Sequence, residues 1–354
     1  MKQSDLVGKV QTVLGIIDPD TIGITLTHEH FLYDTQMHAV SLKEASEKGL
    51  AQQPVSLENL WWVRYNMWSS VDNARYTDEN LAIKEGMRYK LAGGSTFVDL
   101  ANIGICRDPR GLFRISKATG LNIIMGSGFF AAECQMKDIL NLTEDEMTEI
   151  IVKDITIGVG DTGIRSGIIG EVGVMTPIDD FEKKSLRASA QAQKQTGVPI
   201  NIHPSHSDNL VLENIKILKD SGADLSHTVI SHCDAWGFTY DILHELLDAG
   251  CYVEFDTFGY EGYFPEYHGR HFHMPTDEQR IKVIINLINE GYIDKILVSS
   301  DHGVKHALVA YGGWGYDHIL RNAVPLMKIN GMDEVQINKI LIDNPKRMLT
   351  FHSV

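Results

Sequence analysis

Two histidines separated by a single residue are the first feature of the sequence that indicates chemistry. His28 and His30 stand in the segment THEH, at the end of an apolar run. If that run is a β-strand, both imidazoles point to one face while Glu29 points to the other, because side chains alternate along a strand. Buried imidazoles need a metal ion or hydrogen-bond partners. The pair alone thus predicts a metal site or, as the alternative, packed and hydrogen-bonded histidines.

Four further residues with ligand side chains also end apolar runs. They are Glu171 in GIIGEVG, His203 in INIHP, His232 in VISHCD and Asp301 in ILVSSD. Each one alone is compatible with a helix cap or a local hydrogen bond. Four histidines and two carboxylates without a thiolate, however, suit two divalent ions, most typically Zn, with Mn or Co as alternatives. A carboxylate such as that of Glu171 can bridge two ions, and a hydroxide shared between them can act as a nucleophile.

Short apolar runs alternate with amphipathic segments along the chain, and these elements must position the six residues. Strands are predicted at Ile24–His30, Ser95–Ala101, Asn122–Gly128, Gly167–Val174, Pro199–His203, Thr228–His232, Cys251–Phe258 and Lys295–Asp301. Segments with helical period include Thr77–Leu91, Leu142–Gly158, Asp180–Thr196, Asn209–Ser221, Thr239–Ala249 and Asp277–Glu290. Eight such units predict an α/β fold, a (β/α)8 TIM barrel, with a doubly wound sheet as the alternative. The six residues would then meet at the C-terminal mouth of the barrel.

The segments outside the repeated units complete the predicted organisation. Residues 1–23 contain a D-P-D turn between apolar runs and predict a short N-terminal β-hairpin at the bottom of the barrel. Residues 24–354 would form the barrel and its C-terminal helices, so that 1–354 is a single domain. The segment Gln36–Asp72 is rich in tryptophan (Trp61, Trp62, Trp68) and predicts either a lid or an oligomer contact, which would make the protein a homodimer.

Composition and charge exclude several classes of protein. The chain has 354 residues, 43% of them hydrophobic, and a formal net charge of −15, which repels nucleic acid and anionic membrane surfaces. We expect a small-molecule substrate, with no nucleic-acid or membrane partner. The N-terminal residues lack the apolar core of a signal peptide, and four scattered cysteines do not form a disulfide framework. These features predict a cytoplasmic protein.

The segments THEH, GIIGEVG, NIHPS, SHCD and SSDHG, in this order and on these strands, resemble the phosphotriesterase family of the amidohydrolase superfamily. The resemblance covers nearly the whole chain and is strongest to the phosphotriesterase-related group, which has a stretch similar to DHGVKHALVAYGGWGYDHIL. It implies a metal-dependent hydrolase. It also implies that His28, His30 and Asp301 hold the more buried ion, that His203 and His232 hold the more exposed one, and that Glu171 bridges them.

Two departures separate the sequence from the organophosphate-degrading members of that family. Those enzymes bridge their ions with a carboxylated lysine, whereas SGIIGEVG contains no lysine and leaves the bridge to Glu171. They also pass a proton through a histidine and a second aspartate, whose places fall on Thr257 and Ala235 here. Efficient phosphotriester hydrolysis is therefore not expected.

The resemblance implies a reaction in which the bridging hydroxide attacks a polarised carbonyl. Asp301 would be the catalytic residue that takes the proton and delivers it to the leaving group. The substrate would be a small carboxylic ester, lactone or N-acyl amide. The alternatives are a phosphotriesterase-like organophosphate hydrolase and, outside enzymes, a ligand-binding protein on the same barrel. A related nuclease is disfavoured by the net charge of −15.

Aromatic and cationic residues follow the seventh and eighth strands and predict the substrate contacts. We expect Tyr260, Arg270, Lys305 and His306 to bind the substrate, and the cations among them indicate that it has an anionic group. The surrounding cluster also contains Tyr263, Tyr267, His271, His273, Tyr311 and Trp314. As the alternative, Arg270 and Arg280 pair with carboxylates such as Glu261, Glu266 or Asp256, and the aromatics pack the loop. For Arg107 and Asp108, a salt bridge in the loop after the second strand is the corresponding alternative.

Overall fold

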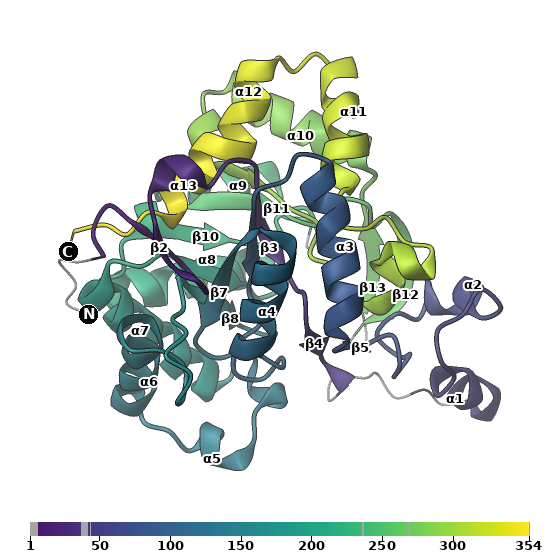
Figure 1. Ribbon diagram of the computed structural model, residues 1–354, viewed down its shortest axis with the longest axis horizontal. Helices are drawn as coiled ribbons and strands as arrows, with labels where there is room; N and C mark the ends of the chain where they lie inside the picture. The colour runs from purple at the N-terminus through teal and green to yellow at the C-terminus, as the bar shows by residue number, and fades with distance from the viewer. Residues whose placement is uncertain (1–5, 37–41, 43, 236, 268–269, 354) are drawn as a thin grey trace.

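The computed structural model describes residues 6–353 except 37–41, 43, 236 and 268–269, and it describes no side chains between 264 and 272. Its main feature is a sheet of eight parallel strands, with helices packed around it (Figure 1). In chain order these are β3 (Thr25–Glu29), β6 (Thr96–Asp99), β7 (Asn122–Ser127), β8 (Ile168–Gly173), β9 (Ile200–His203), β10 (Thr228–Ile230), β11 (Tyr252–Phe255) and β14 (Ile296–Val298).

Hydrogen bonds between the two edge strands bring the ends of this sheet together. The backbone N–H of His28 donates to Oγ of Ser299 (3.0 Å), and that of Asp301 donates to the carbonyl of His28 (3.2 Å). The strands otherwise pair with their sequence neighbours, so the sheet curves into a nearly closed barrel. The predicted (β/α)8 TIM barrel is confirmed, and the doubly wound alternative is wrong.

The helices lie between the strands, and the six segments predicted from their helical period form helices close to the predicted bounds, whereas α4 and α5 were not among those segments. They are α3 (Glu79–Leu91), α4 (Pro109–Thr119), α6 (Glu144–Thr156), α7 (Asp180–Thr196), α8 (Asp208–Asp220), α9 (Tyr240–Asp248) and α10 (Asp277–Asn289), with a short α5 (Lys137–Leu140) before α6. Thr143 caps α6 in a reciprocal capping box with Glu146. Asp108 is the N-cap of α4, and Arg107 instead pairs with Asp154 (2.7 Å), so the two do not form the salt bridge considered from the sequence.

The N-terminal hairpin and the C-terminal helix close the bottom of the barrel. Strands β1 (Val10–Thr12) and β2 (Gly15–Ile17) pair antiparallel, so the predicted hairpin is present. Its turn lies at Val13 and Leu14 and not at the D-P-D sequence, which instead forms a short 3₁₀ turn at Pro19–Thr21 capped by Asp18. The C-terminal helices are α11 (Val324–Ile329), α12 (Glu334–Asn338) and α13 (Asn344–Leu349). Beyond α13, Phe351 exchanges backbone hydrogen bonds with Gly8 and Lys9.

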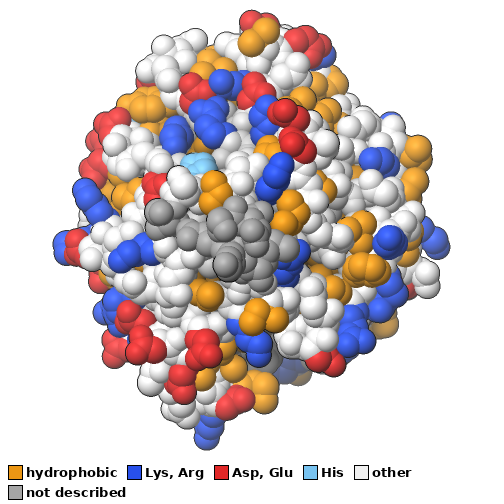
Figure 2. All heavy atoms as spheres, turned by 60° about the vertical axis from the view of Figure 1, so that its left-hand side comes forward, with side chains coloured by type: hydrophobic (Ala, Val, Ile, Leu, Met, Phe, Trp, Pro, Cys, Tyr) orange, Lys and Arg blue, Asp and Glu red, His pale blue; other side chains and the backbone are white. Residues whose placement is uncertain are grey.

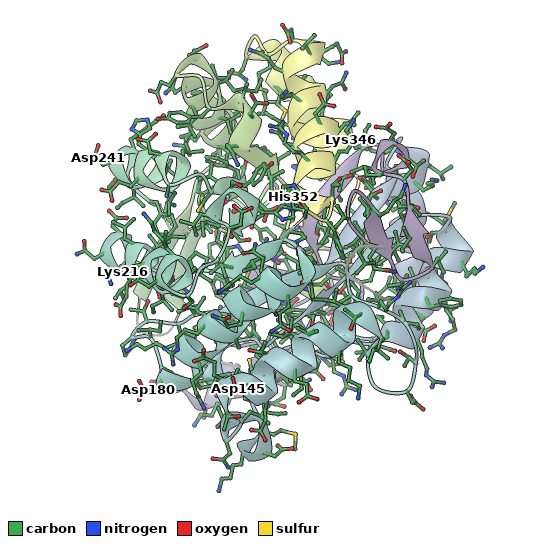
Figure 3. The ribbon with its side chains drawn as sticks, turned by 90° about the vertical axis from the view of Figure 1, so that its left-hand side faces the viewer. Asp145, Asp180, Lys216, Asp241, Lys346 and His352 are labelled. Carbon is green, nitrogen blue, oxygen red and sulfur yellow. The ribbon has the colours of Figure 1, made fainter. Side chains whose placement is uncertain are left out.

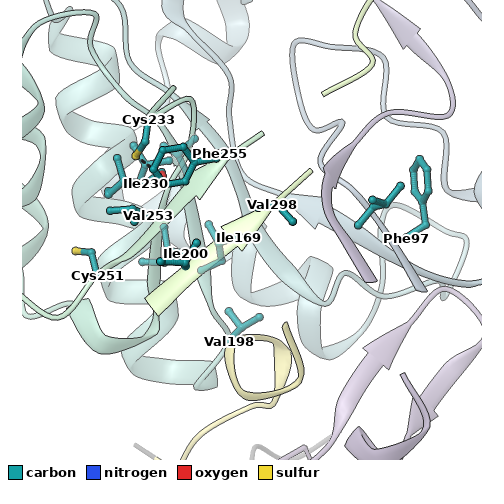
Figure 4. Packing of buried hydrophobic residues seen from close by; sticks show 14 of the residues in the cluster. Phe97, Ile169, Val198, Ile200, Ile230, Cys233, Cys251, Val253, Phe255 and Val298 are labelled. Atoms are coloured by element: carbon teal, nitrogen blue, oxygen red, sulfur yellow. Dashed lines mark hydrogen bonds between the residues drawn. The ribbon is translucent and has the colours of Figure 1, made fainter. Parts of the chain in front are cut away.

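Apolar side chains fill the barrel below its mouth and the layer between strands and helices. One buried cluster joins residues from opposite strands with residues of the hairpin and of α13, which places it inside the barrel; it contains Val98, Ile124, Ile168, Val229, Tyr252, Leu297, Val10, Ile22, Met348 and Leu349. A second cluster packs the outer faces of the strands against the helices, and Ile169, Ile200, Val253 and Val298 belong to it (Figure 4). Full burial of each such side chain is worth about 1.5–3 kcal/mol.

Three smaller elements cover the mouth. The segment after β3 contains α1 (Ala45–Ala51) and α2 (Leu60–Val63), and it is flanked by the strand pair β4 (Tyr33–Asp34) and β5 (Arg75–Tyr76). The loop after β11 forms a hairpin of β12 (Gly262–Tyr267) and β13 (Arg270–Met274). Trp61 is exposed, but Trp62 is buried in a local cluster with Val55 and Leu60, so only the first of these two tryptophans could serve the predicted oligomer contact.

Many charged side chains lie on the outer surface of the helices. Asp145, Asp180, Lys216 and Asp241 are exposed on α6 to α9 (Figure 3), and acidic and basic groups are intermixed on the face shown in Figure 2. In the described part of the chain no helix has both the length and the apolar character needed to cross a bilayer. Cys106, Cys134, Cys233 and Cys251 are all free thiols. A cytoplasmic location stays a prediction.

Candidate active site

The six residues singled out in the sequence come together at the C-terminal ends of five strands. His28 and Glu171 belong to β3 and β8, and His203 ends β9; His30, His232 and Asp301 lie one to three positions beyond the ends of β3, β10 and β14. The ring centroid of His28 lies 5.7 Å from that of His30 and 4.9 Å from that of His232, and the rings of His203 and His232 are 4.5 Å apart. Glu29 points elsewhere, toward Ser299 and His302, as the alternation of β3 predicts.

Glu171 lies between two pairs of histidines. Its Oε1 is 3.4 Å from Nε2 of His30, while its Oε2 is 3.5 Å from Nε2 of His28. The same Oε2 is 3.0 Å from Nδ1 of His203 and 3.6 Å from Nε2 of His232. One carboxylate therefore faces both pairs, which is the arrangement that a bridging ligand requires.

Glycine at position 170 allows β8 to present this carboxylate. Its φ is +148°, and a Cβ there would lie 2.7 Å from the backbone oxygen of Asn201 on the neighbouring strand β9. A larger residue would push β8 away from β9 and move Glu171 from the histidines.

Asp301 completes the cluster on the side that opens to solvent. Its Oδ1 is 3.2 Å from Nε2 of His30, its Oδ2 is 3.9 Å from Nδ1 of His232, and its side chain is 25% exposed. Asp301 and His232 have φ values of +44° and +56°, in the left-handed region that residues other than glycine rarely adopt. Such conformations cost about 1–3 kcal/mol each and concentrate at functional sites.

The donor atoms of this cluster fit divalent metal ions. Nε2 of His28 and both ring nitrogens of His30 are buried and make no well-aligned hydrogen bond with the described residues, while carboxylate oxygens of Glu171 and Asp301 lie 3.2–3.7 Å from the two Nε2 atoms. A metal ion between these nitrogens and carboxylates would satisfy both kinds of donor atom. Among the described residues four groups of three donors lie close enough to share an ion, and Glu171 belongs to two of them, the group of His28, His30 and Glu171 and the group of Glu171, His203 and His232.

A buried carboxylate behind the histidines orients two of them, a role that was not predicted from the sequence. Asp256, which follows β11, has Oδ2 3.0 Å from Nδ1 of His28 and Oδ1 2.9 Å from Nδ1 of His232. It also accepts the backbone N–H of His232. Hydrogen bonds at Nδ1 turn Nε2 of both rings toward the cluster. The alternation of Glu254 and Asp256 in YVEFDT was the sequence signal that could have identified it.

Charge within the cluster shifts the acid–base equilibria of its members. Burial alone lowers the pKa of His30, but Asp301 and Glu171 outweigh it and raise that pKa to about 9. In the same way Asp256 and Glu171 overcome burial and raise the pKa of His232 to about 10. Burial raises the pKa of Glu171, yet the histidines, His28 foremost, hold it well below its usual value. The site without a metal ion thus binds positive charge, as protons on His28, His30 and His232, whereas burial and His232 lower the pKa of His203.

A pocket in two adjoining parts lies above the cluster. The parts have volumes of about 90 and 100 Å³ and share Tyr33, Thr35, Trp68, Thr257, Met274 and Asp301. Glu171, His203 and His232 line one part, and Tyr260 lines the other. Trp68 comes from the segment predicted to be a lid or an oligomer contact, so that part of the segment adjoins the pocket.

The other predicted substrate contacts have different positions. Lys305 and His306 are not among the residues that line the pocket, and they bond to Asp72 and Asn73. The side chain of Arg270 lies outside the described residues, as do those of Tyr267 and His271.

The positions at which the organophosphate-degrading enzymes have their proton relay are occupied differently. Thr257 and Ala235 both line the pocket. The hydroxyl of Thr257 donates to Oδ2 of Asp234 (2.6 Å), which also accepts Nε of Arg280 (2.6 Å). Arg280 pairs in addition with Asp277 (3.0 Å), so its described partners are not Glu261 or Asp256, which were suggested from the sequence; the side chain of Glu266 lies outside the described residues.

Comparison with known proteins supports what the geometry indicates. The model of the phosphotriesterase family matches residues 8–349. An N-acetyltaurine hydrolase from Dictyostelium discoideum is 42% identical over 98% of this chain and 99% of that relative.

Solved structures agree. A resiniferatoxin-binding protein from Rhodobacter sphaeroides has a TM-score of 0.93 and 31% identity, over 99% of this chain and 98% of that one. The lactonase Lmo2620 from Listeria monocytogenes has a TM-score of 0.78 and 25% identity, over 98% and 100%. The family predicted from the sequence is thereby confirmed: the chain belongs to the phosphotriesterase family and is a hydrolase.

Proposed function

We propose that the chain is a binuclear metal-dependent hydrolase that cleaves a small N-acyl amide, with a lactone or carboxylic ester as the other substrate classes. The observation that carries this proposal is the position of Glu171, whose single carboxylate faces both histidine pairs, with Oε1 toward His30 and Oε2 toward His28, His203 and His232. His28, His30 and Asp301 would hold one ion, His203 and His232 the other, and Glu171 would bridge them. Zn is the first choice of ion, with Mn or Co as alternatives. When bound, the two ions would polarise the carbonyl and activate water.

Side chains of the protein would transfer the proton and contact the substrate. Asp301 is partly exposed and lines both parts of the pocket, so a carboxylate oxygen can reach the attacking water and the leaving group. It would accept a proton from water and deliver it to the leaving nitrogen, so that amide and water give a carboxylic acid and an amine. Trp68, Tyr260 and Met274 would exclude bulk water and contact the acyl group.

The choice of substrate class draws on the relatives. One relative is named an N-acetyltaurine hydrolase and another a lactonase. Taurine has a sulfonate, which matches the anionic group predicted from the sequence. Arg270 is our proposed contact for that group. Phosphotriesters are disfavoured, because Thr257 and Ala235 cannot pass a proton as histidine and aspartate would.

Metal analysis beside a hydrolysis screen tests the proposal. Protein purified without chelator is compared with Glu171→Ala and Asp301→Asn on N-acetyltaurine, N-acetyl amino acids, lactones and a paraoxon-like triester. We expect about two ions per chain, turnover of one carbonyl class, and a loss of at least about 100-fold in both variants. Fewer than one ion per chain, or equal activity of the variants, would contradict it.

The anionic group has its own test. N-acetyltaurine is compared with N-ethylacetamide, which keeps the amide and lacks the sulfonate, in the wild type, Arg270→Ala and the control Arg110→Ala on the exposed side of α4. We expect Arg270→Ala alone to reduce the preference for N-acetyltaurine by about tenfold or more. An unchanged preference would remove Arg270 from the proposal.

A further inference from the structure

Lys305 and His306 connect the loop after β14 to the segment that precedes β5. Nζ of Lys305 is 2.7 Å from Oδ1 of Asp72, and the backbone N–H of Lys305 donates to the carbonyl of Asn73 (2.8 Å). The backbone N–H of His306 and its ring Nδ1 both meet Oδ1 of Asn73, at 2.9 and 3.1 Å. Four contacts thus join Lys305 and His306 of the loop to Asp72 and Asn73 of the segment.

The same two acceptor residues organise the segment internally. Oδ2 of Asp72 accepts the backbone N–H of Val55 (2.8 Å), and Nδ2 of Asn73 donates to the carbonyl of Met67 (3.0 Å). Asn73 is fully buried, and the side chain of Lys305 is only 13% exposed. The contacts therefore lie in a site partly or fully shielded from water, where charge-assisted hydrogen bonds are stronger than on an open surface.

This segment supplies one wall of the pocket. Met67, Trp68 and Ala74 line it, and Gly303 and Val304, just before Lys305, line it as well. Met67 and Val304 also pack in one buried cluster with Tyr260 and Met274. The contacts of Lys305 and His306 thus join two segments that both line the pocket.

We propose that Lys305 and His306 are positioning residues that latch the wall formed by Met67 and Trp68 to the loop after β14, and that they set the width of the substrate pocket. The latch is defined here as the contacts of Lys305 and His306 with Asp72 and Asn73. Lys305 and His306 would then affect substrate binding by holding the pocket wall in place, and not by the direct substrate contact predicted from the sequence. The effect on substrate binding rests on the proposed hydrolase function; the latch itself does not.

The geometry of each group supports this role. The ammonium of Lys305 is directed to Asp72 and lies 5.5 Å from the ring centroid of Tyr311, so an anion in the pocket would have to replace an existing pair. Oδ1 of Asn73 can only accept, so Nδ1 of His306 donates to it. Burial, which is the largest effect, lowers the pKa of His306 to about 3 and keeps the ring neutral.

Hydrogen exchange and steady-state kinetics together test the latch in the metal-loaded, full-length protein. The variants are Lys305→Met, which keeps the aliphatic stem, Asp72→Asn, the double variant, and Lys305→Arg. The matched control is Lys339→Met, which removes a lysine–aspartate pair of the same length, 2.7 Å to Asp294, far from the pocket.

We expect backbone amides of residues 67–76 to exchange about tenfold faster in Lys305→Met and Asp72→Asn, with the barrel strands unchanged. KM should rise about tenfold while kcat stays within about twofold, because the pocket wall contributes to the ground and transition states alike. The double variant should be no worse than either single one, since both remove the same pair. Lys305→Arg should keep the exchange rate of residues 67–76 and KM close to those of the wild type. Lys339→Met should change neither the exchange rate nor KM.

Two results would overturn the proposal: exchange of residues 67–76 unchanged in both single variants, or faster exchange with unchanged KM. Because Asp72→Asn preserves the shape of the side chain, it keeps the test decisive if Lys305→Met folds poorly. If the wild type hydrolyses no substrate, the proposed function fails, and the exchange measurement alone then decides whether the latch exists.

Discussion

At the scale of single residues, the role of an ionisable side chain in this protein depends on which groups surround its charged atoms. Asp256 and Asp301 are both aspartates at strand ends, yet Asp256 is fully buried against Nδ1 of two histidines, while Asp301 opens to the pocket. The first can only orient ligands. The second can also reach a substrate. Arg280 shows the same dependence, because its guanidinium is buried between Asp234 and Asp277 and serves the structure behind Thr257.

Replacement of Asp256 by asparagine should weaken metal binding. An amide cannot accept a hydrogen bond at both of its atoms, so His28 or His232 loses its orienting partner, and we expect the affinity for Zn to fall by about 10–100-fold. Competition with a chromophoric chelator measures this without any substrate. Glu182→Gln is the control, because Glu182 is a buried carboxylate that accepts only backbone N–H groups. Equal Zn affinity in Asp256→Asn and wild type would contradict the assignment.

At the scale of elements, short polar contacts determine where strands and helices begin and how they join. The capping box of Thr143 and Glu146 starts α6 where the sequence pattern predicts it. At the bottom of the barrel, His227 precedes β10, donates to the carbonyl of Met348 on α13, and stacks on His352 at 3.9 Å. One neutral imidazole thus joins the C-terminal helix to the barrel.

His227 makes the stability of this junction depend on pH. Burial foremost, then repulsion from His352, lowers its pKa from 6.5 to about 3 in the folded protein. The unfolded chain therefore binds the proton first, so His227 adds stability above pH 6.5 that is lost as the pH falls toward 3. From pH 7.5 to pH 5 the loss is about 2 kcal/mol.

Urea unfolding at pH 7.5 and pH 5 measures this loss. The wild type should lose about 2 kcal/mol more than His227→Gln, which keeps a donor to Met348 but cannot be protonated. His244→Gln, which removes a partly exposed histidine on α9, is the control and should behave like the wild type. The same acid dependence in His227→Gln and wild type would show that His227 titrates normally.

At the scale of the whole molecule, the candidate metal centre links strands from around the barrel. Its six residues lie in β3, β8 and β9 or within three positions of the ends of β3, β10 and β14, and β3 and β14 are the two edges that no backbone ladder joins. Ions bound there would join these edges as well as take part in the reaction. Metal binding is therefore expected to stabilise the closed barrel.

Removal of the ions should lower the melting temperature. Metal present at about 1,000 times its Kd stabilises a protein by about 4 kcal/mol per site, which corresponds to a shift on the order of 5–10 °C for a chain of this size. Calorimetry before and after chelation, and again after Zn is restored, measures the shift. Glu171→Ala should melt at nearly the same temperature with and without chelator. A wild type that is insensitive to chelation would contradict a metal centre built from these residues.

The sequence by itself determined the barrel and the six residues of the candidate metal centre. Strand and helix periods depend on neighbouring residues, and the C-terminal ends of parallel strands always meet at one mouth, so no tertiary detail was needed. The tertiary structure decided the rest. Asp72 and Lys305 are 233 positions apart, and local pattern cannot show that a lysine beside the site bonds to a distant aspartate and not to a substrate. The burial of Trp62, the partners of Arg280 and the role of Asp256 depend in the same way on which distant segments pack together.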